Sequence, residues 1–181
     1  TALLQVITRR AVEMVRGTSG VTYLWDAPSK TLIPRAWHGL EDWMGAVRVN
    51  LGEGVTGMAA PHRQGIMVND DQASPTGEPL FAILAEPLIY RDRLLGVLTI
   101  NNERTGRVFG TAERDLLMLF ASQAAIAIEN ARLYEALEAR FARLRTLTRL
   151  NQLISSSLDI GQVLSEIAQA AATLMGAYTV T

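Results

Sequence analysis

The sequence contains no cysteine and only two histidines, His38 and His62. Without thiols, the chain can form no disulfide, thiolate metal ligand, cysteine nucleophile or thioether-linked cofactor. Neither histidine has an acidic partner at a spacing typical of a triad or a metal site, and nothing selects either one for haem. We interpret both as solvent-facing loop residues. We therefore predict no catalytic residue, no metal site and no cofactor.

The chain also lacks an excess of either charge and any long apolar run. Seventeen Lys and Arg balance eighteen Asp and Glu, which argues against a nucleic-acid partner. No wholly apolar run approaches the roughly 20 residues that span a bilayer, and no signal segment opens the chain. We expect a soluble, cytoplasmic piece without membrane contact. Because Thr1 falls within a helical pattern and is not Met, we expect this piece to belong to a longer protein.

Apolar spacing divides the first 110 residues into elements. A helical stripe from Leu4 to Val15 ends at Gly17. Residues 20–26 and 31–37 read as a hairpin around the turn at 27–30, and residues 83–90 and 94–101 as a second hairpin around 91–93. Between them lies a variable region, 39–79, with a short helix near 55–60 and a short strand at 66–69.

A last helix begins near Thr111, which can cap it, with Glu113 in its first turn. A full capping box is absent, because the third residue after Thr111 is Arg114. The helical pattern continues far beyond the needs of one domain. Its apolar stripe has an average spacing of about 3.4 residues, close to the coiled-coil period: Leu133, Leu137, Phe141, Leu144, Leu147 and Leu150. We predict a homodimer in which this helix runs parallel to a second copy.

An internal repeat suggests what the long helix connects. An offset of 160 aligns the apolar positions of residues 164–175 with those of residues 4–15. We therefore divide the chain into a domain at 1–135, a connecting helix at 136–157 and the start of a second, similar domain at 158–181.

Four stretches resemble the GAF domain family: GEGVTGMAA at 52–60, VNDD at 68–71, RLLGVLTINN at 93–102 and the helix start from Phe109 to Glu135. The order and spacing of these stretches are jointly specific. The resemblance implies an α+β fold, GAF-like and PAS-related. Its central antiparallel sheet has five or six strands, with helices on both sides and a long C-terminal connecting helix. It also implies a ligand pocket beneath the variable region.

Relatives with known ligands differ from this chain at the residues they use. Cyclic-nucleotide-binding members carry Asn-Lys, Phe and Asp-Glu, where this sequence has Asn101-Asn102, Phe109 and Glu113-Arg114. Bilin-binding members and methionine sulfoxide reductases need cysteines. The resemblance therefore implies none of these activities here.

The remaining hypothesis is a sensory module of a signalling protein, such as a sensor histidine kinase of a two-component system, that is not itself an enzyme and binds an unknown small molecule. Candidate ligand-binding residues are Trp37, Trp43, Asn69, Asp70, Phe81 and Thr99. For the aromatic residues the alternative is ordinary core packing, and for Asp70 a solvated loop position. The pocket wall would be either Leu98 and Ile100 or their neighbours Val97 and Thr99, because side chains alternate along a strand. The other possible function is a ligand-free structural dimerisation module.

Overall fold

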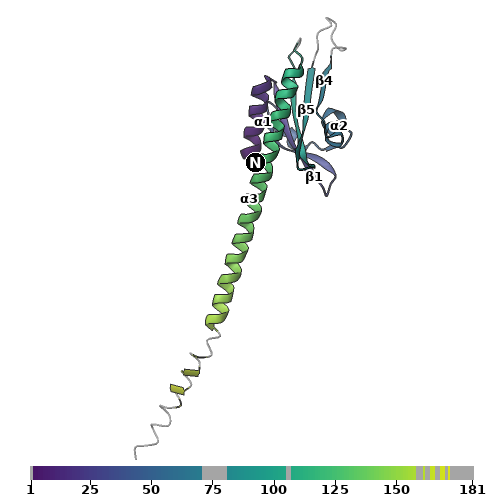
Figure 1. The fold of residues 1–181 in the computed structure, drawn as a ribbon. Coiled ribbons are helices and arrows are strands. Elements are labelled where there is room, and N and C mark those ends of the chain that lie inside the picture. Colours follow the sequence, from purple (N-terminus) through teal and green to yellow (C-terminus); the bar gives the residue numbers. More distant parts are fainter. Residues whose placement is uncertain are drawn as a thin grey trace, which may run out of the picture. The chain divides into compact units, whose positions relative to one another are not determined.

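The structure, a computed structural model, describes residues 2–70, 81–104 and 107–157, with isolated helical positions between 161 and 171. The chain forms two units, residues 1–132 and residues 133–181 (Figure 1). The expected start of a second domain at 158–181 lies outside the described residues except for those isolated positions. The expected boundaries at 135 and 157 stay predictions.

The first unit is built on a six-stranded antiparallel sheet with the strand order β3-β2-β1-β6-β5-β4. The strands are β1 (Ser19–Asp26), β2 (Thr31–His38), β3 (Val49–Asn50), β4 (Ile66–Asp70), β5 (Phe81–Tyr90) and β6 (Arg93–Asn102). The helices are α1 (Ala2–Val15), the 3-10 turn η1 (Asp42–Ala46), α2 (Gly54–His62) and α3 (Thr111–Ser157). This architecture confirms the predicted α+β, GAF-like fold.

The sheet separates two apolar cores. α1 and the start of α3 cover one face and α2 lies on the other (Figure 1). Leu98 and Ile100 of β6 are fully buried in the core beneath α1 and α3. Val97 belongs to the core on the α2 side, and Thr99 of the same face bonds to α2. Strand alternation thus assigns Val97 and Thr99 to the face that carries the variable region.

Two details of the fold differ from the sequence prediction. The short turn η1 and the two-residue strand β3 were not predicted from the sequence, because both have too few residues to show a periodic pattern. β3 pairs with β2 at the sheet edge. The start of α3 also differs, because the backbone N–H of Gly110 donates to Glu113 Oε2 at 3.0 Å. Gly110 therefore occupies the cap position that we expected for Thr111, and Thr111 is the first helical residue. Glu113 supplies only the acidic half of a capping box, because glycine has no side chain to supply the other half.

The first part of α3 packs against the sheet through its apolar face. Leu117, Ala121, Ala124 and Ala125 are almost wholly buried there. By length and composition alone, one window within Thr111–Leu150 could cross a membrane. About a third of that window, 33%, is buried within the structure.

Candidate functional site

The face of the sheet beneath α2 is where the resemblance places a ligand pocket, and it is largely filled by side chains. Eight buried residues form its core: Val21, Tyr23, Leu32, Met44, Ala59, Ala60, Ala85 and Val97. Tyr23 donates its hydroxyl to Met44 Sδ at 3.8 Å, and burial raises the pKa of this phenol. This packing between β1 and η1 leaves the core apolar.

Polar groups do occur on this face, at one end of α2. Thr56 and Thr99 share a hydrogen bond between their hydroxyls at 3.0 Å, and Thr99 is only 4% exposed. This bond links α2 to β6. A ligand that formed a hydrogen bond with the Thr99 hydroxyl would have to do so beside Thr56 or take the place of Thr56 as its partner.

The three aromatic candidates do not converge on one cavity. Trp37 of β2 is half-buried, and its ring lies over Gly45, where an added Cβ would be 3.2 Å from the ring. Trp43 is 59% exposed and Phe81 is 37% exposed. Trp37 and Phe81 lie three strands apart, roughly 14 Å at the usual strand spacing. They are also offset along the strands, because the register places Trp37 level with Ala85. Of the three, only Trp37 packs against the core on the α2 side.

Asn69 lies on the opposite face from Thr99, so the structure does not bring these two candidates together. Its amide Nδ2 donates to the carbonyl of Phe109 at 2.9 Å, and its Oδ1 accepts from the backbone N–H of Phe109 at 3.1 Å. Asn69 therefore holds the segment that leads into α3. Asp70 is the last residue of β4, and its side chain lies outside the described part.

Both histidines are exposed, but neither lies in a loop as expected. His38 ends β2 and His62 ends α2, where the His62 ring Nδ1 is 2.7 Å from the carbonyl oxygen of Met58. Within the described residues, no group of three or more His, Asp or Glu side chains is placed to hold a metal ion.

A buried carboxyl escaped the sequence analysis. Glu86 of β5 is 4% exposed, and desolvation raises its pKa to about 7, opposed by Arg114 and reinforced by Asp115 of α3. The signal that could have found it is parity, since Glu86 lies on the same face of β5 as Ala82, Leu84 and Leu88, which are all fully buried.

The comparison with known families decides what this fold is. The profile of the GAF domain family matches residues 1–129. The chain belongs to the GAF domain family.

One curated protein is similar to this chain in sequence. The dual 3',5'-cyclic-AMP and -GMP phosphodiesterase 11A of Takifugu rubripes is 27% identical in an alignment of 143 residues, which covers 72% of this chain and 16% of that protein. The chain therefore spans about a sixth of that protein's length.

Among solved structures, the second GAF domain of DevS from Mycobacterium smegmatis matches with a TM-score of 0.65 and 18% identity, over 75% of this chain and 97% of that one. The GAF domain of a phosphoenolpyruvate-protein phosphotransferase from Coxiella burnetii gives a TM-score of 0.63 and 22% identity, over 74% and 84%. A methyl-accepting chemotaxis protein gives 0.61 and 22%, over 74% and 90%. These likenesses show the fold alone, and that fold is the one of a GAF domain.

The positions that carry the cyclic-nucleotide signature in other GAF domains have structural roles here. Asn102 is fully buried and donates to the carbonyls of Arg104 at 3.2 Å and Arg107 at 2.8 Å. Phe109 is held by Asn69, and Glu113 caps α3. These residues shape the connection from β6 to α3.

Proposed function

We propose that this GAF domain is a sensory module of a larger signalling protein, which dimerises through α3 and passes the effect of a small-molecule ligand along that helix to an output domain. The proposed longer protein carries a second GAF domain and is a sensor such as a histidine kinase. The observation that carries the proposal is α3 itself, which is one helix of 47 residues from Thr111 to Ser157. Its start is part of the domain core and its end extends well past it in sequence.

The second part of α3 has an apolar stripe that is exposed. The stripe consists of the residues expected to form the dimer: Leu133, Leu137, Phe141, Leu144, Leu147 and Leu150, each 48% to 58% exposed. At roughly 25 cal/mol per Å² of apolar surface, burying such a stripe against a second copy favours association. Arginines and glutamates flank it, as beside a coiled-coil seam.

Exposed apolar residues continue the same spacing into the first unit. Leu116, Leu119 and Ile126 are 41%, 63% and 42% exposed, although they lie on the part of α3 whose other side is buried. Ile126, Leu133 and the later Leu147 stand at multiples of seven residues. This heptad spacing supports a dimer contact that begins on the GAF domain and extends along α3.

One observation favours the alternative, a ligand-free dimerisation module. The eight-residue core beneath α2 occupies much of the region where the resemblance places a ligand. A thermal-shift screen of cyclic nucleotides, other nucleotides and small planar metabolites separates the two functions, because a ligand that binds only the folded state raises the melting temperature. We expect a shift with at least one compound but not with cyclic nucleotides. A screen with no shift at all would favour the structural module.

The dimer is tested by placing charges in the stripe. Leu137→Glu combined with Leu144→Glu sets two carboxylates in each helix of the seam, where their burial without partners is unfavourable. We expect sedimentation velocity to show a dimer for the parent chain and a monomer for the double variant.

A matched control uses the other side of the same helix. Ala139→Glu with Thr146→Glu adds the same charges at the same separation, about 160° to 200° around the helix from Leu137 at 100° per residue. This control should remain dimeric. A Leu137, Leu144 variant that sediments as a dimer would place the interface elsewhere.

A further inference from the structure

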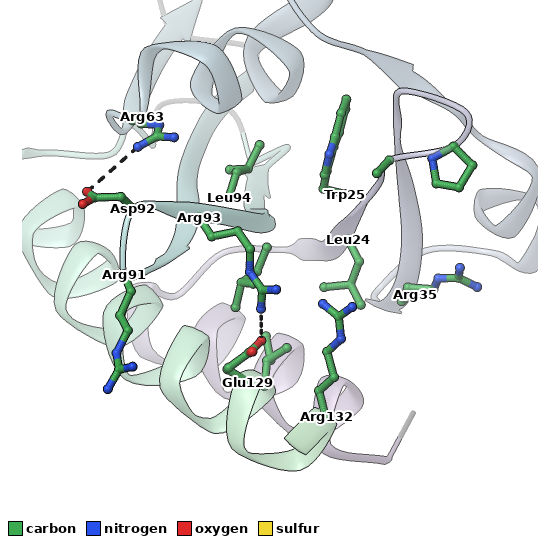
Figure 2. Close-up of a pocket in the computed structure, with 14 residues that line it drawn as sticks. Leu24, Trp25, Arg35, Arg63, Arg91, Asp92, Arg93, Leu94, Glu129 and Arg132 are labelled. Atoms are coloured by element: carbon green, nitrogen blue, oxygen red, sulfur yellow. Dashed lines mark hydrogen bonds and ion pairs between the residues drawn. The ribbon is translucent and has the colours of Figure 1, made fainter. Parts of the chain in front are cut away.

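A groove at one end of the sheet lies outside the region discussed so far (Figure 2). The ladder between β1 and β6 ends at the pair Leu24 and Gly96. Beyond this pair β1 continues to Asp26 along β2, while β6 begins at Arg93 along β5. The two hairpins therefore separate, and α3 crosses the opening at Ile128, Glu129 and Arg132. The resulting groove has a volume of about 680 Å³, within the usual range for small-molecule sites.

Positive charge dominates the lining of this groove. Five arginines face two acids, Asp92 and Glu129, so that the lining carries a formal excess of three positive charges. The arginines are Arg35, Arg63, Arg91, Arg93 and Arg132. In a chain with a net charge of −1, this excess is a local feature and attracts anions.

The two acids leave much of this charge uncompensated. Arg93 donates through Nη2 to Glu129 Oε2, while Arg63 and Asp92 make only a long, exposed contact of 4.0 Å. Arg35 lies near Asp26, whose pKa is lowered mainly by hydrogen bonds from Ser29 and in smaller part by this arginine.

Arg132 and Arg91 are the other two arginines of the groove. Arg132 is exposed and has no hydrogen-bond or ion-pair partner among the described residues. It extends from α3 toward Leu24 (Figure 2) and lines the groove together with Arg93. Arg91 lies over the ring of Tyr90 at 5.4 Å. Arg132 and Arg93 thus line the same groove, and of these two guanidiniums only that of Arg93 is paired with the Glu129 carboxylate.

The walls of the groove are apolar. Leu24, Trp25, Pro28, Leu94, Leu95 and Ile128 contribute to the lining, and Trp25 and Leu94 are only partly buried. A purely ionic ligand would leave these walls unused. An organic ligand could cover them, and a flat ring could pack on Trp25.

We propose that this groove binds an organic phosphate, with the phosphate held by Arg132 and Arg93 and the organic part on the apolar walls. A phosphate group carries up to two negative charges at neutral pH and offers several acceptor oxygens. It can therefore occupy both guanidinium forks, which a single carboxylate such as Glu129 does not satisfy.

Binding here would act on α3 directly. Arg132 is the last residue of the first unit. A phosphate bound to both Arg93 and Arg132 would therefore join the β5–β6 hairpin to α3 at the point where the connecting part of that helix begins. The binding step itself does not rest on the proposed dimer. It should therefore persist in the Leu137→Glu, Leu144→Glu variant, so that failure of one proposal leaves the other standing.

The test is calorimetric titration of the chain with ADP at low ionic strength, with adenosine, inorganic phosphate and citrate as comparisons. We expect ADP to bind more tightly than each of the three and its affinity to fall as salt is added. Equal binding of adenosine would overturn the role of the phosphate, and equal binding of inorganic phosphate the role of the apolar walls. Tighter binding of citrate would overturn the choice of phosphate. Absence of ADP binding would overturn the proposal as a whole.

Three variants locate the site. Arg132→Gln should weaken ADP binding about tenfold, as expected for loss of one charged hydrogen-bonding group. Arg140→Gln, the same change eight residues farther along α3, should have no effect. Glu129→Gln removes the acid that competes for Arg93 and should strengthen binding. Melting temperatures show that each variant is folded. Equal losses in Arg132→Gln and Arg140→Gln, or weaker binding in Glu129→Gln, would contradict the assignment.

Discussion

The two parts of α3 have inverted compositions. Residues 111–132 contain six alanines and three leucines, and residues 133–157 contain three alanines and six leucines. In the first part the alanines Ala121, Ala124 and Ala125 are buried against the sheet. In the second part the leucines of the stripe are exposed.

The difference reflects what each part packs against. A helix can approach a sheet closely only where its side chains are small, so alanine is suited to the first part. Leucine at coiled-coil spacing instead suits contact with another helix. One continuous helix thus combines a face suited to its own domain with a stripe suited to a partner, and substitutions at the two places should have different consequences.

The largest expected difference in stability is between a leucine substitution in the first part of α3 and one in the second part. Leu117 is fully buried and packs in the core beneath α1 and α3, so Leu117→Ala should lower the free energy of unfolding by about 3 kcal/mol through lost burial and a new cavity. Leu147 is 51% exposed. Leu147→Ala should change the stability of the monomer by less than about 0.5 kcal/mol.

Urea denaturation at low protein concentration measures both values. The comparison is sharpest in the Leu137→Glu, Leu144→Glu background, where dimerisation should not contribute. Similar losses for Leu117→Ala and Leu147→Ala would contradict the division of α3 into a core part and a partner-binding part.

A smaller effect concerns the buried carboxyl beneath the first part of α3. Glu86 has a pKa of about 7 in the folded chain, against an ordinary value of 4.5. The unfolded chain therefore loses this proton at lower pH than the folded chain does. The contribution of Glu86 to stability is fully present below about pH 4.5, falls as pH rises toward 7 and levels off above it.

Glu86→Gln removes this titration. The variant should be more stable than the parent above pH 7, by on the order of 2 kcal/mol, because glutamine carries no charge to desolvate. Urea midpoints from pH 5 to pH 8 test this. Glu135→Gln, at an exposed position of α3, should leave the slope unchanged. A parent chain that gains stability between pH 5 and pH 7 while Glu86→Gln does not would contradict the shift.

The sequence predicted the elements that depend on local periodicity. The two hairpins, α2 and β4 were found because their apolar spacing and turn residues are local signals. β3 was missed because its two residues, Val49 and Asn50, gain their strand conformation only by pairing with β2. The choice between Val97 and Leu98 as the inner face toward α2 needed the packing of whole helices against the sheet.

The candidate site was less accessible to sequence reasoning. Asn69 was selected as a polar residue at a strand end, but its partner is the backbone of Phe109, 40 positions away. The five arginines of the groove come from β2, the residue that follows α2, the β5–β6 turn, β6 and α3, and no local pattern joins them. Such long-range juxtapositions follow from sheet order, which the sequence alone did not supply.

The smallest effect concerns the start of α3, where the cap differs from the expected one. Glu113 accepts the backbone N–H of Gly110, and hydrogen bonds from its own backbone N–H and from that of Gly110 hold the pKa of its carboxyl below the ordinary value. Glu113→Gln keeps a hydrogen-bond acceptor but removes the negative charge. A negative charge is favourable near a helix N-terminus. We expect a loss of about 0.5 kcal/mol at neutral pH.

This loss should shrink in acid. The contribution of the Glu113 charge is present above the ordinary pKa of 4.5 and is lost as pH falls through the lowered folded value. Thr111→Ala serves as the control, because Thr111 is the first helical residue and not the cap. It should cost less than Glu113→Gln in urea denaturation. A larger loss of stability for Thr111→Ala would show that Thr111 is the cap residue. Equal stability of Glu113→Gln and the parent chain would show that the charge of Glu113 does not stabilise the start of α3.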